Sequence, residues 1–293
     1  MDNRAEVRDF LVSRRAKLSP EQAGVPDYGE RRRVPGLRRD EVARLAGVSV
    51  DYYTRLEKGN LSTASDSVLD GIAHALQLDE AERGHPADLA RASRAGGRQP
   101  RRRIPQQRVR PSVTHLLESM FGSAAFVRNG RMDILAVNAL GRALWSPLFD
   151  TVGQPNLARF AFLDPRGADF YADWADAAKG AVALLRTEAG RAPHDKALTD
   201  LVGELATRSE NFRSWWATHD VRLHCTGVKR LHHPEVGELT LTFNALDMPA
   251  DPGLTLTAYT AEPGSPSEER LRLLASWSAS ITPDPFSSAT DQS

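Results

Sequence analysis

One stretch, residues 37–60 (LRRDEVARLAGVSVDYYTRLEKGN), constrains the fold of this chain more than any other. Apolar residues recur at helical spacing as far as Ala46, and Gly47 then ends the helix as glycine does at a tight C-terminal turn. Ser49 is suited to cap a second helix, whose apolar positions recur every three residues until Gly59 ends it. Two short helices joined by a glycine-containing turn are typical of a helix-turn-helix, although an ordinary helical hairpin would show the same spacing.

The net charge of the chain is zero, but the charges are unevenly distributed. Residues 1–110 hold 22 Lys+Arg and 16 Asp+Glu, which gives +6, and the remaining residues hold 16 and 22, which gives −6. A basic first third joined to an acidic remainder favours a head that binds nucleic acid and a body that phosphate does not attract. Chance variation in a solvated surface is the alternative.

The length of 293 residues suffices for two domains, and 41% hydrophobic with 26% charged residues is ordinary for a soluble globular protein. No apolar run is long enough to span a membrane, and the charged N-terminus is not a signal peptide. The single cysteine, Cys225, cannot form an internal disulfide. These observations predict a cytoplasmic protein that does not insert into membranes.

The detailed sequence of the first stretch resembles a known family. The string RRRVPGLRRDEVARLAGVSVDYYTRLEKG, residues 31–59, is similar to the helix-turn-helix of phage-repressor-like (xenobiotic-response-element family) transcriptional regulators, and within them to the MmyB-like branch. The shared elements are EVARLAGVS, the aromatic anchor Tyr53 and LEKG. The resemblance implies that the second helix, residues 49–58, docks in the major groove of double-stranded DNA.

Docking as in that family implies a role for individual side chains. Arg55 can pair with a guanine, Asp51 can accept from a cytosine amino group, and Val50 can touch a thymine methyl. Glu57 is expected to form a salt bridge inside the domain. Because one recognition helix covers only a few base pairs, a homodimer is expected to read two half-sites. The residues expected to contact the DNA backbone are Arg38, Arg39, Tyr52, Lys58 and Asn60.

Composition divides the chain into four segments. Residues 1–95 are predicted to form an all-α helix-turn-helix head with five helices, of which the fifth spans about 79–95. Residues 96–110 form an Arg/Pro/Gly-rich linker that cannot bury apolar surface. Residues 111–279 are predicted to form a second domain, and the Ser/Pro/Asp-rich tail, 280–293, is predicted to be disordered.

The second domain is predicted to be α+β with a five-stranded antiparallel sheet. Asn129-Gly130 is a strong signal for a type I′ turn between two short strands, and Asn138 can cap the helix that follows. Further helices are expected at 113–121, 156–163, 170–188, 195–208, 210–218 and 267–279. Strands are expected at 124–128, 132–137, 221–231, 238–247 and 254–261.

This domain also resembles a known one, the ligand-binding domain of the MmyB-like regulators. The similar stretches are ILAVN, NLARFAFLDP, YADWADAAKGAVALLR, SENFRSWWATHDV, KRLHHPEVGELTLTF and LTAYTAEPGS. The resemblance implies a PAS-like fold that encloses a small-molecule cavity, with fatty acyl compounds as the ligand class and no resident cofactor. The chain would then be a ligand-responsive, sequence-specific transcription regulator. The alternatives are a C-terminal domain that recruits a protein partner, or one that turns over its ligand.

A lipid-like ligand requires apolar walls with a few polar anchors. For most of the aromatic residues here, a place in the core is the simpler interpretation. Trp215 and Trp216 are neighbours, however, so on a helix both cannot face one core direction. The candidates for the ligand site are Asn138, Trp145, Arg159, Phe162, Trp174, Phe212, Trp215 and His232.

Residues 219–233 contain four histidines and Cys225, but their spacing does not fit a metal site. His224 and Cys225 would point to opposite faces of a strand, and no CxxC or HxxxH pattern occurs. No nucleophile elbow, P-loop, dinucleotide-binding or zinc-protease motif is found in the sequence. We therefore expect neither a metal site nor an enzyme.

Overall fold

The computed structural model describes residues 3–25, 34–61, 64–78, 82, 108–150, 153–217 and 226–281. By their contacts, the residues group into two compact units, Met1–Arg103 with Val182–Leu223, and Ile104–Ala181 with His224–Ser293. Several predictions lie outside the described residues. These are the fifth helix of the head apart from residue 82, most of the linker, the segment 218–225 and the tail from residue 282.

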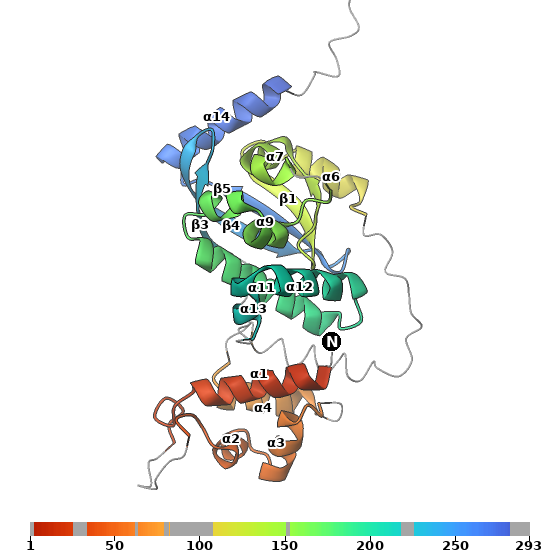
Figure 1. The fold of residues 1–293 in the computed structure, drawn as a ribbon, viewed down its shortest axis with the longest axis vertical. Coiled ribbons are helices and arrows are strands. Elements are labelled where there is room, and N and C mark those ends of the chain that lie inside the picture. Colours follow the sequence, from red (N-terminus) through yellow and green to blue (C-terminus); the bar gives the residue numbers. More distant parts are fainter. Residues whose placement is uncertain are drawn as a thin grey trace, which may run out of the picture. The chain divides into compact units, whose positions relative to one another are not determined.

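The head contains four described helices, which are α1 (Asn3–Lys17), α2 (Arg39–Leu45), α3 (Val50–Glu57) and α4 (Asp66–Ala75) (Figure 1). α2 and α3 are the two helices of the predicted helix-turn-helix. The Ser49 side chain caps α3 by accepting a hydrogen bond from the backbone N–H of Tyr52 at 3.2 Å. Gly47 has a φ of +68°, which residues with a Cβ rarely adopt, so glycine permits the tight turn between α2 and α3.

The four helices of the head enclose one apolar core. Their buried side chains recur at helical spacing, so each helix presents one apolar face inward. Tyr53, the predicted aromatic anchor, is fully buried in this core. The main contributors are Val7, Phe10, Leu11, Leu37, Val42, Leu56, Leu69 and Ile72.

One buried carboxylate connects three of these helices. Glu57 of α3 is 2% exposed, and its Oε1 accepts a hydrogen bond from Nε of Arg15 in α1 at 2.7 Å. Its Oε2 accepts one from Nε of Arg39 in α2. Arg15 also donates to the backbone carbonyl of Leu37 at 2.8 Å. Glu57 therefore has the structural role that its sequence position predicted, and the bond raises the pKa of the Arg39 guanidinium.

The second unit is organised on a five-stranded antiparallel sheet with the strand order β2-β1-β5-β4-β3. Together with the helical head, this sheet confirms the predicted fold class, an all-α part followed by an α+β part. The strands are β1 (Ala124–Asn129), β2 (Ile134–Val137), β3 (Thr226–His233), β4 (Gly237–Asp247) and β5 (Leu254–Thr260).

Along the chain, helices precede the sheet, separate its second and third strands, and follow it. Of these helices, residues 182–217 group with the first unit. The Asp195 side chain begins one of them as predicted, because it accepts a hydrogen bond from the backbone N–H of Ala197 at 2.9 Å. The remaining described helices are α6 (Pro111–Glu118), α7 (Ala139–Leu144), α8 (Ser146–Phe149), α9 (Leu157–Leu163), α10 (Pro165–Phe170), α11 (Trp174–Arg191), α12 (Lys196–Arg208), α13 (Glu210–Ala217) and α14 (Pro266–Ile281).

The two faces of the sheet differ. The outer face packs against α6, in an apolar cluster formed by Val113, Leu117, Ala125, Val127, Leu254 and Leu256. Farther along the outer face, Val228 on β3 and Leu246 on β4 are exposed. Because side chains alternate along a strand, the immediate neighbours of these residues in each strand point to the opposite, inner face of the sheet.

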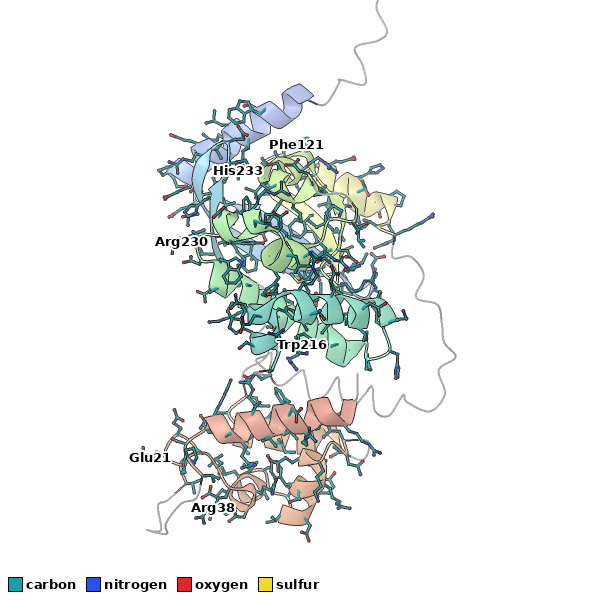
Figure 2. The ribbon with its side chains drawn as sticks, viewed as in Figure 1. Glu21, Arg38, Phe121, Trp216, Arg230 and His233 are labelled. Atoms are coloured by element: carbon teal, nitrogen blue, oxygen red, sulfur yellow. The ribbon has the colours of Figure 1, made fainter. Side chains whose placement is uncertain are left out.

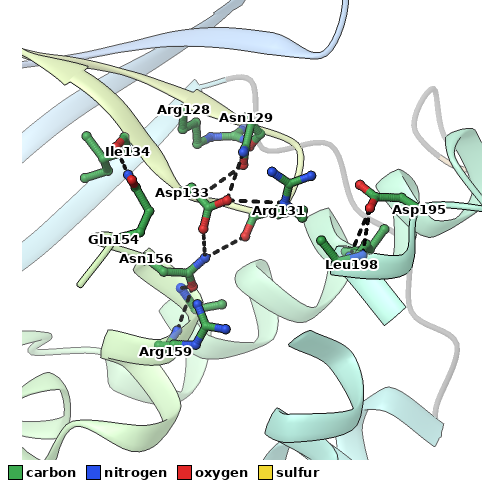
Figure 3. Close-up of polar contacts among 12 residues, drawn as sticks. Arg128, Asn129, Arg131, Asp133, Ile134, Gln154, Asn156, Arg159, Asp195 and Leu198 are labelled. Atoms are coloured by element: carbon green, nitrogen blue, oxygen red, sulfur yellow. Dashed lines mark hydrogen bonds and ion pairs between the residues drawn. The ribbon is translucent and has the colours of Figure 1, made fainter. Parts of the chain in front are cut away.

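The hairpin between β1 and β2 differs from the predicted type I′ turn. Neither Asn129 nor Gly130 has a positive φ, whereas Met132 has a φ of +67°, and β2 begins only at Ile134. Side-chain bonding explains the difference (Figure 3). Asn129 Oδ1 accepts from the backbone N–H of Asp133 at 3.0 Å, and Asn129 Nδ2 donates to the Asp133 carboxylate at 2.9 Å. These bonds close a longer loop than the two-residue turn.

The predicted helix 170–188 is interrupted. α10 ends at Phe170, and α11 begins only at Trp174. Between them, Tyr171 forms an isolated β-bridge with Leu231 of β3, and the backbone N–H of Ala172 donates to the carbonyl of Arg230 at 3.1 Å. Pairing with a strand that is distant in sequence has overridden the local helical pattern.

We predict that Glu57→Gln destabilises the head by about 1–3 kcal/mol, because two guanidinium groups lose a buried charged acceptor. Glu21→Gln is the matched control, since Glu21 is an exposed carboxylate of the same head (Figure 2). Hydrogen exchange of peptides from α1, α2 and α3 should be faster in the first variant and unchanged in the second. Equal protection in both variants would contradict the structural role of Glu57.

Candidate functional site

The base-reading candidates lie on the outward face of α3. Val50 is 45% exposed, and Asp51 and Arg55 are exposed one turn apart, whereas Tyr53 on the opposite side is buried. The Arg55 guanidinium lies 5.4 Å from the ring centroid of Tyr52, a cation–π contact that holds the side chain along the helix surface. These side chains are therefore positioned by a helix whose other face is fixed in the core.

The residues expected to contact the DNA backbone differ in their exposure to solvent. Lys58 and Asn60 are exposed at the end of α3, while Arg38 and Tyr52 are partly buried. Arg39 is half exposed, but its Nε bonds to Glu57, so the residue also holds α2 against α3. The sequence did not predict this structural role. A substitution of Arg39 would consequently change the stability of the head as well as any contact with phosphate.

In the second unit, the structure places Trp145 at the centre of an aromatic cluster on the inner face of the sheet. Its indole is 1% exposed. Its ring centroid lies 6.0 Å from that of Tyr171, which comes from the bridge before α11, and 5.7 Å from that of Tyr259 on β5. Phe126 of β1 and Phe170 of α10 lie against it at 6.1 and 5.3 Å.

A lysine that the sequence candidates omitted completes this cluster. The ammonium nitrogen of Lys229, on β3, lies 5.6 Å from the ring centroid of Tyr171 and 5.7 Å from that of Phe243 on β4. Phe243 in turn lies 5.9 Å from Tyr259. Lys229, Tyr171, Trp145, Tyr259 and Phe243 thus form a closed circuit of contacts, which we call the Lys229 cluster.

The polar atoms of this region are unusual. Within the described part of the chain, Trp145 Nε1 and Thr257 Oγ1 are buried without a hydrogen-bond partner. The ammonium of Lys229 likewise forms no hydrogen bond or ion pair with the described residues. Burial lowers the pKa of Lys229, and the charge of Asp176 acts in the opposite direction. Burial also raises the pKa of Tyr171 and Tyr259, so both phenols stay protonated and able to donate.

His233 lies on the same face of β3 but is fully bonded. Its Nε2 lies 3.0 Å from the carbonyl oxygen of Ala143, and its Nδ1 accepts from the backbone N–H of Glu235 at 3.2 Å. This pair of bonds fits the neutral ring, and burial lowers the pKa of His233. His232 is exposed on the opposite face, where Nδ1 lies 3.2 Å from the carbonyl oxygen of Asp169. The candidate His232 is therefore separate from the Lys229 cluster.

Asn138, another polar candidate, has its amide occupied within the protein. Its Oδ1 accepts from the backbone N–H groups of Ala125 at 3.0 Å and Gly141 at 2.7 Å. Its Nδ2 donates to the carbonyls of Met120 and Ser123 at 3.0 and 2.8 Å. Asn138 is thus the predicted cap of α7 and also ties α7 to β1.

The other candidates lie in separate groups. Phe162 and Trp174 contact each other edge to face at 6.3 Å, and Trp174 Nε1 donates to the carbonyl of Ala161 at 2.8 Å. Arg159 is partly buried on α9, where its backbone N–H donates to Asn156 at 2.9 Å (Figure 3).

Phe212 and Trp215 belong to α13, in the other compact unit. Phe212 is buried and stacks on Trp216, with 5.4 Å between ring centroids, while Trp215 is partly buried. The Arg186 guanidinium lies 4.3 Å from the centroid of the Trp216 ring. The structure therefore brings only Trp145, of the eight ligand-site candidates, into the Lys229 cluster.

Comparison with known families gives two matches. Residues 109–274 match the model of the MmyB-like transcription regulator ligand binding domain, and residues 14–85 match that of a helix-turn-helix domain. The first match covers more than half of the chain. The chain belongs to the MmyB-like transcription regulators. It is accordingly a ligand-responsive transcription regulator with a DNA-binding helix-turn-helix. The two matched families indicate a regulator and not an enzyme. No curated protein matches it.

Two further properties of this MmyB-like regulator concern the described residues only. Among them, no three His, Cys, Asp or Glu side chains come together in a way that could hold a metal ion. The predicted histidine-rich segment is only partly covered by this statement, since His219, His224 and Cys225 lie outside the described residues. Within the same ranges, every helix is too short or too polar to cross a bilayer.

We predict that two exposed cations of the regulator act differently on DNA. Arg55→Ala should cost about 1–3 kcal/mol on the best site and relax the preference at one base pair, because a base contact is lost. Lys58→Ala should weaken binding to all sequences alike and make the salt dependence shallower by roughly one unit of slope. Fluorescence anisotropy on operator and scrambled duplexes at several salt concentrations separates these effects. An equal loss on both duplexes for Arg55→Ala would contradict this docking.

Proposed function

We propose that this regulator binds its operator as a homodimer through α3, and that an apolar small molecule of the fatty acyl class changes its affinity for DNA. The head lies within residues 1–95, and the ligand-binding domain lies within residues 111–279. The ligand binds at the Lys229 cluster on the inner face of the sheet. The observation that carries this proposal is the closed circuit of four aromatic side chains and a lysine whose ammonium has no hydrogen-bond or ion-pair partner among the described residues.

Unsatisfied polar atoms support a ligand at this place. A core that serves stability alone normally satisfies its buried polar groups, and each unsatisfied group costs about 1–3 kcal/mol. Trp145 Nε1 and Thr257 Oγ1 are two such groups, and both belong to the inner face. A molecule with an apolar body and a polar end, seated between aromatic walls, would give such groups partners and bury its own chain.

The arrangement of the sheet supports a PAS-like description of the ligand-binding domain. The antiparallel order β2-β1-β5-β4-β3 leaves β2 and β3 at opposite edges. The chain between these two edge strands contains the helices from α7 to α13. Residues of α10, of the bridge before α11 and of the sheet all contribute rings to the cluster around Trp145.

Recruitment of a protein partner is the second candidate function. Large apolar side chains are exposed in this domain, among them Phe121 at 84% (Figure 2), and such side chains favour a contact with another protein where they form a patch. Mass spectrometry of an organic extract of the purified protein separates the candidates. A small-molecule sensor should release a co-purified apolar compound, which a domain that only recruits a protein would not contain.

The ligand proposal predicts a change in DNA affinity. Dodecanoic acid should shift the operator affinity of the full-length protein by roughly 5–150-fold, which corresponds to a coupling free energy of about 1–3 kcal/mol. Butanoic acid is the control, because it carries the same polar end on a chain too short to fill the aromatic site. Anisotropy titrations with each acid measure the shift. Bound dodecanoic acid that leaves operator affinity unchanged would show that the domain does not signal in this way.

The homodimer proposal predicts the stoichiometry on DNA. Two copies of α3 should occupy half-sites about 34–36 Å apart, because each recognition helix spans only a few base pairs. Sedimentation of the full-length protein with an operator duplex should therefore give two protein chains per duplex. One chain per duplex at saturating protein would rule out the dimer.

A further inference from the structure

We infer that Lys229 is the anchor for a carboxylate, so that the regulator senses an ionised apolar acid and discriminates against neutral compounds of the same chain length. This inference rests on the ligand-binding function proposed above and specifies its chemistry. It places the polar end of the ligand at Lys229, which is not among the ligand-site residues expected from the sequence.

The position of Lys229 in the sheet supports this role. β3 pairs with β4 in a register that sets Lys229 opposite Leu241 and Leu231 opposite Leu239. Leu231, Leu239 and Leu241 are all buried, and Leu241 lies two positions from Phe243 of the Lys229 cluster, which identifies their face as the inner one. Alternation along β3 therefore directs Lys229 inward, whereas its neighbour Arg230 points outward and pairs with Asp173 at 2.6 Å.

The surroundings of Lys229 lack the groups that normally balance a lysine. Aromatic rings of Tyr171 and Phe243 face its ammonium, and their negative π faces stabilise a cation only partly. In the described part of the chain, Asp176 influences Lys229 through its charge but forms no ion pair with it. The Lys229 side chain is partly buried, and a partly desolvated charge without an ion-pair partner is less stable than one in water. A ligand carboxylate would supply that partner.

The cluster contains further groups that suit a carboxylate. An ionised carboxylate accepts hydrogen bonds only, and it has about four acceptor positions. The phenols of Tyr171 and Tyr259 are protonated donors, and no described residue forms a hydrogen bond with either. An ammonium and two phenols can thus serve one carboxylate, while the ring faces of Trp145 and Phe243 are left for an apolar chain. A primary alcohol would use the donors poorly and leave the ammonium unbalanced.

The test compares dodecanoic acid with 1-dodecanol on the full-length protein. We expect Lys229→Met to lower the affinity for the acid by about 10-fold or more, because a hydrogen bond to a charged group contributes at least that much to binding. The affinity for the alcohol should stay nearly unchanged. Lys229→Arg should retain most of the acid affinity. The matched control is Lys196→Met, the same substitution at an exposed lysine of α12, and it should change neither affinity.

Thermal unfolding without ligand provides an independent readout. Because Lys229→Met removes a partly buried charge that has no ion-pair partner among the described residues, its Tm should be equal to or above that of the wild type. If this variant unfolds at a lower temperature, Lys229→Arg decides the question, since it keeps the charge and must then bind the acid.

The outcomes separate this inference from the function on which it rests. A selective loss of the acid in Lys229→Met supports the anchor. If acid and alcohol are weakened equally, or if neither is weakened, the anchor is wrong while an apolar ligand remains. If the wild type binds neither compound, both the anchor and the fatty acyl ligand class are overturned.

Discussion

Enclosure of the inner sheet face by aromatic rings is the constraint on which the second unit depends, and Trp145 is the residue at its centre. Its indole contacts rings from β1, from β5 and from the segment between α9 and α11, so one side chain joins elements far apart in the sequence. Aromatic pairs contribute about 0.5–1.5 kcal/mol each beyond the area they bury. Part of that gain is offset by the unpaired Trp145 Nε1 and by the partly desolvated ammonium of Lys229. A local loss of stability inside a well-packed face is typical of a functional site.

The head has a different requirement, because it must expose polar side chains for DNA and still keep its own fold. Glu57 receives hydrogen bonds from α1 and α2, and Tyr53 beside it is buried, so the inward half of α3 is fixed. Burial, with the charge of Glu57 as a second cause, raises the pKa of Tyr53 and keeps its phenol neutral. Val50, Asp51 and Arg55 are consequently free of any role in the core. One side of α3 thus contributes to the stability of the head, while the other side remains exposed to solvent.

The sequence predicted those parts of the structure that depend on local signals. Gly47 and Ser49 determine the turn and the cap of the helix-turn-helix through their own backbone and side-chain chemistry, and the structure agrees. The turn at Asn129 was predicted wrongly, because its side chain bonds to a residue four positions away. Tyr171 was assigned to a helix because its pairing with β3 is not visible locally. Lys229 was omitted because a charged residue on a strand suggests solvent, although alternation with buried Leu231 would have placed it inward.

The location of Lys229 on β3 determines which part of the domain a bound ligand can influence. β3 is also bonded along its edge to the residues just before α11. Leu231 forms the bridge with Tyr171, and the backbone N–H of Ala172 donates to the carbonyl of Arg230. The ion pair of Arg230 with Asp173 lies at the surface, where water screens it, so this junction is held mainly by backbone bonds. Tyr171 belongs both to the junction and to the Lys229 cluster. A ligand that bound two arrangements of the junction with equal affinity would not shift the equilibrium between them. A response therefore requires that the contacts of the ligand with Tyr171 and Lys229 differ between the two arrangements.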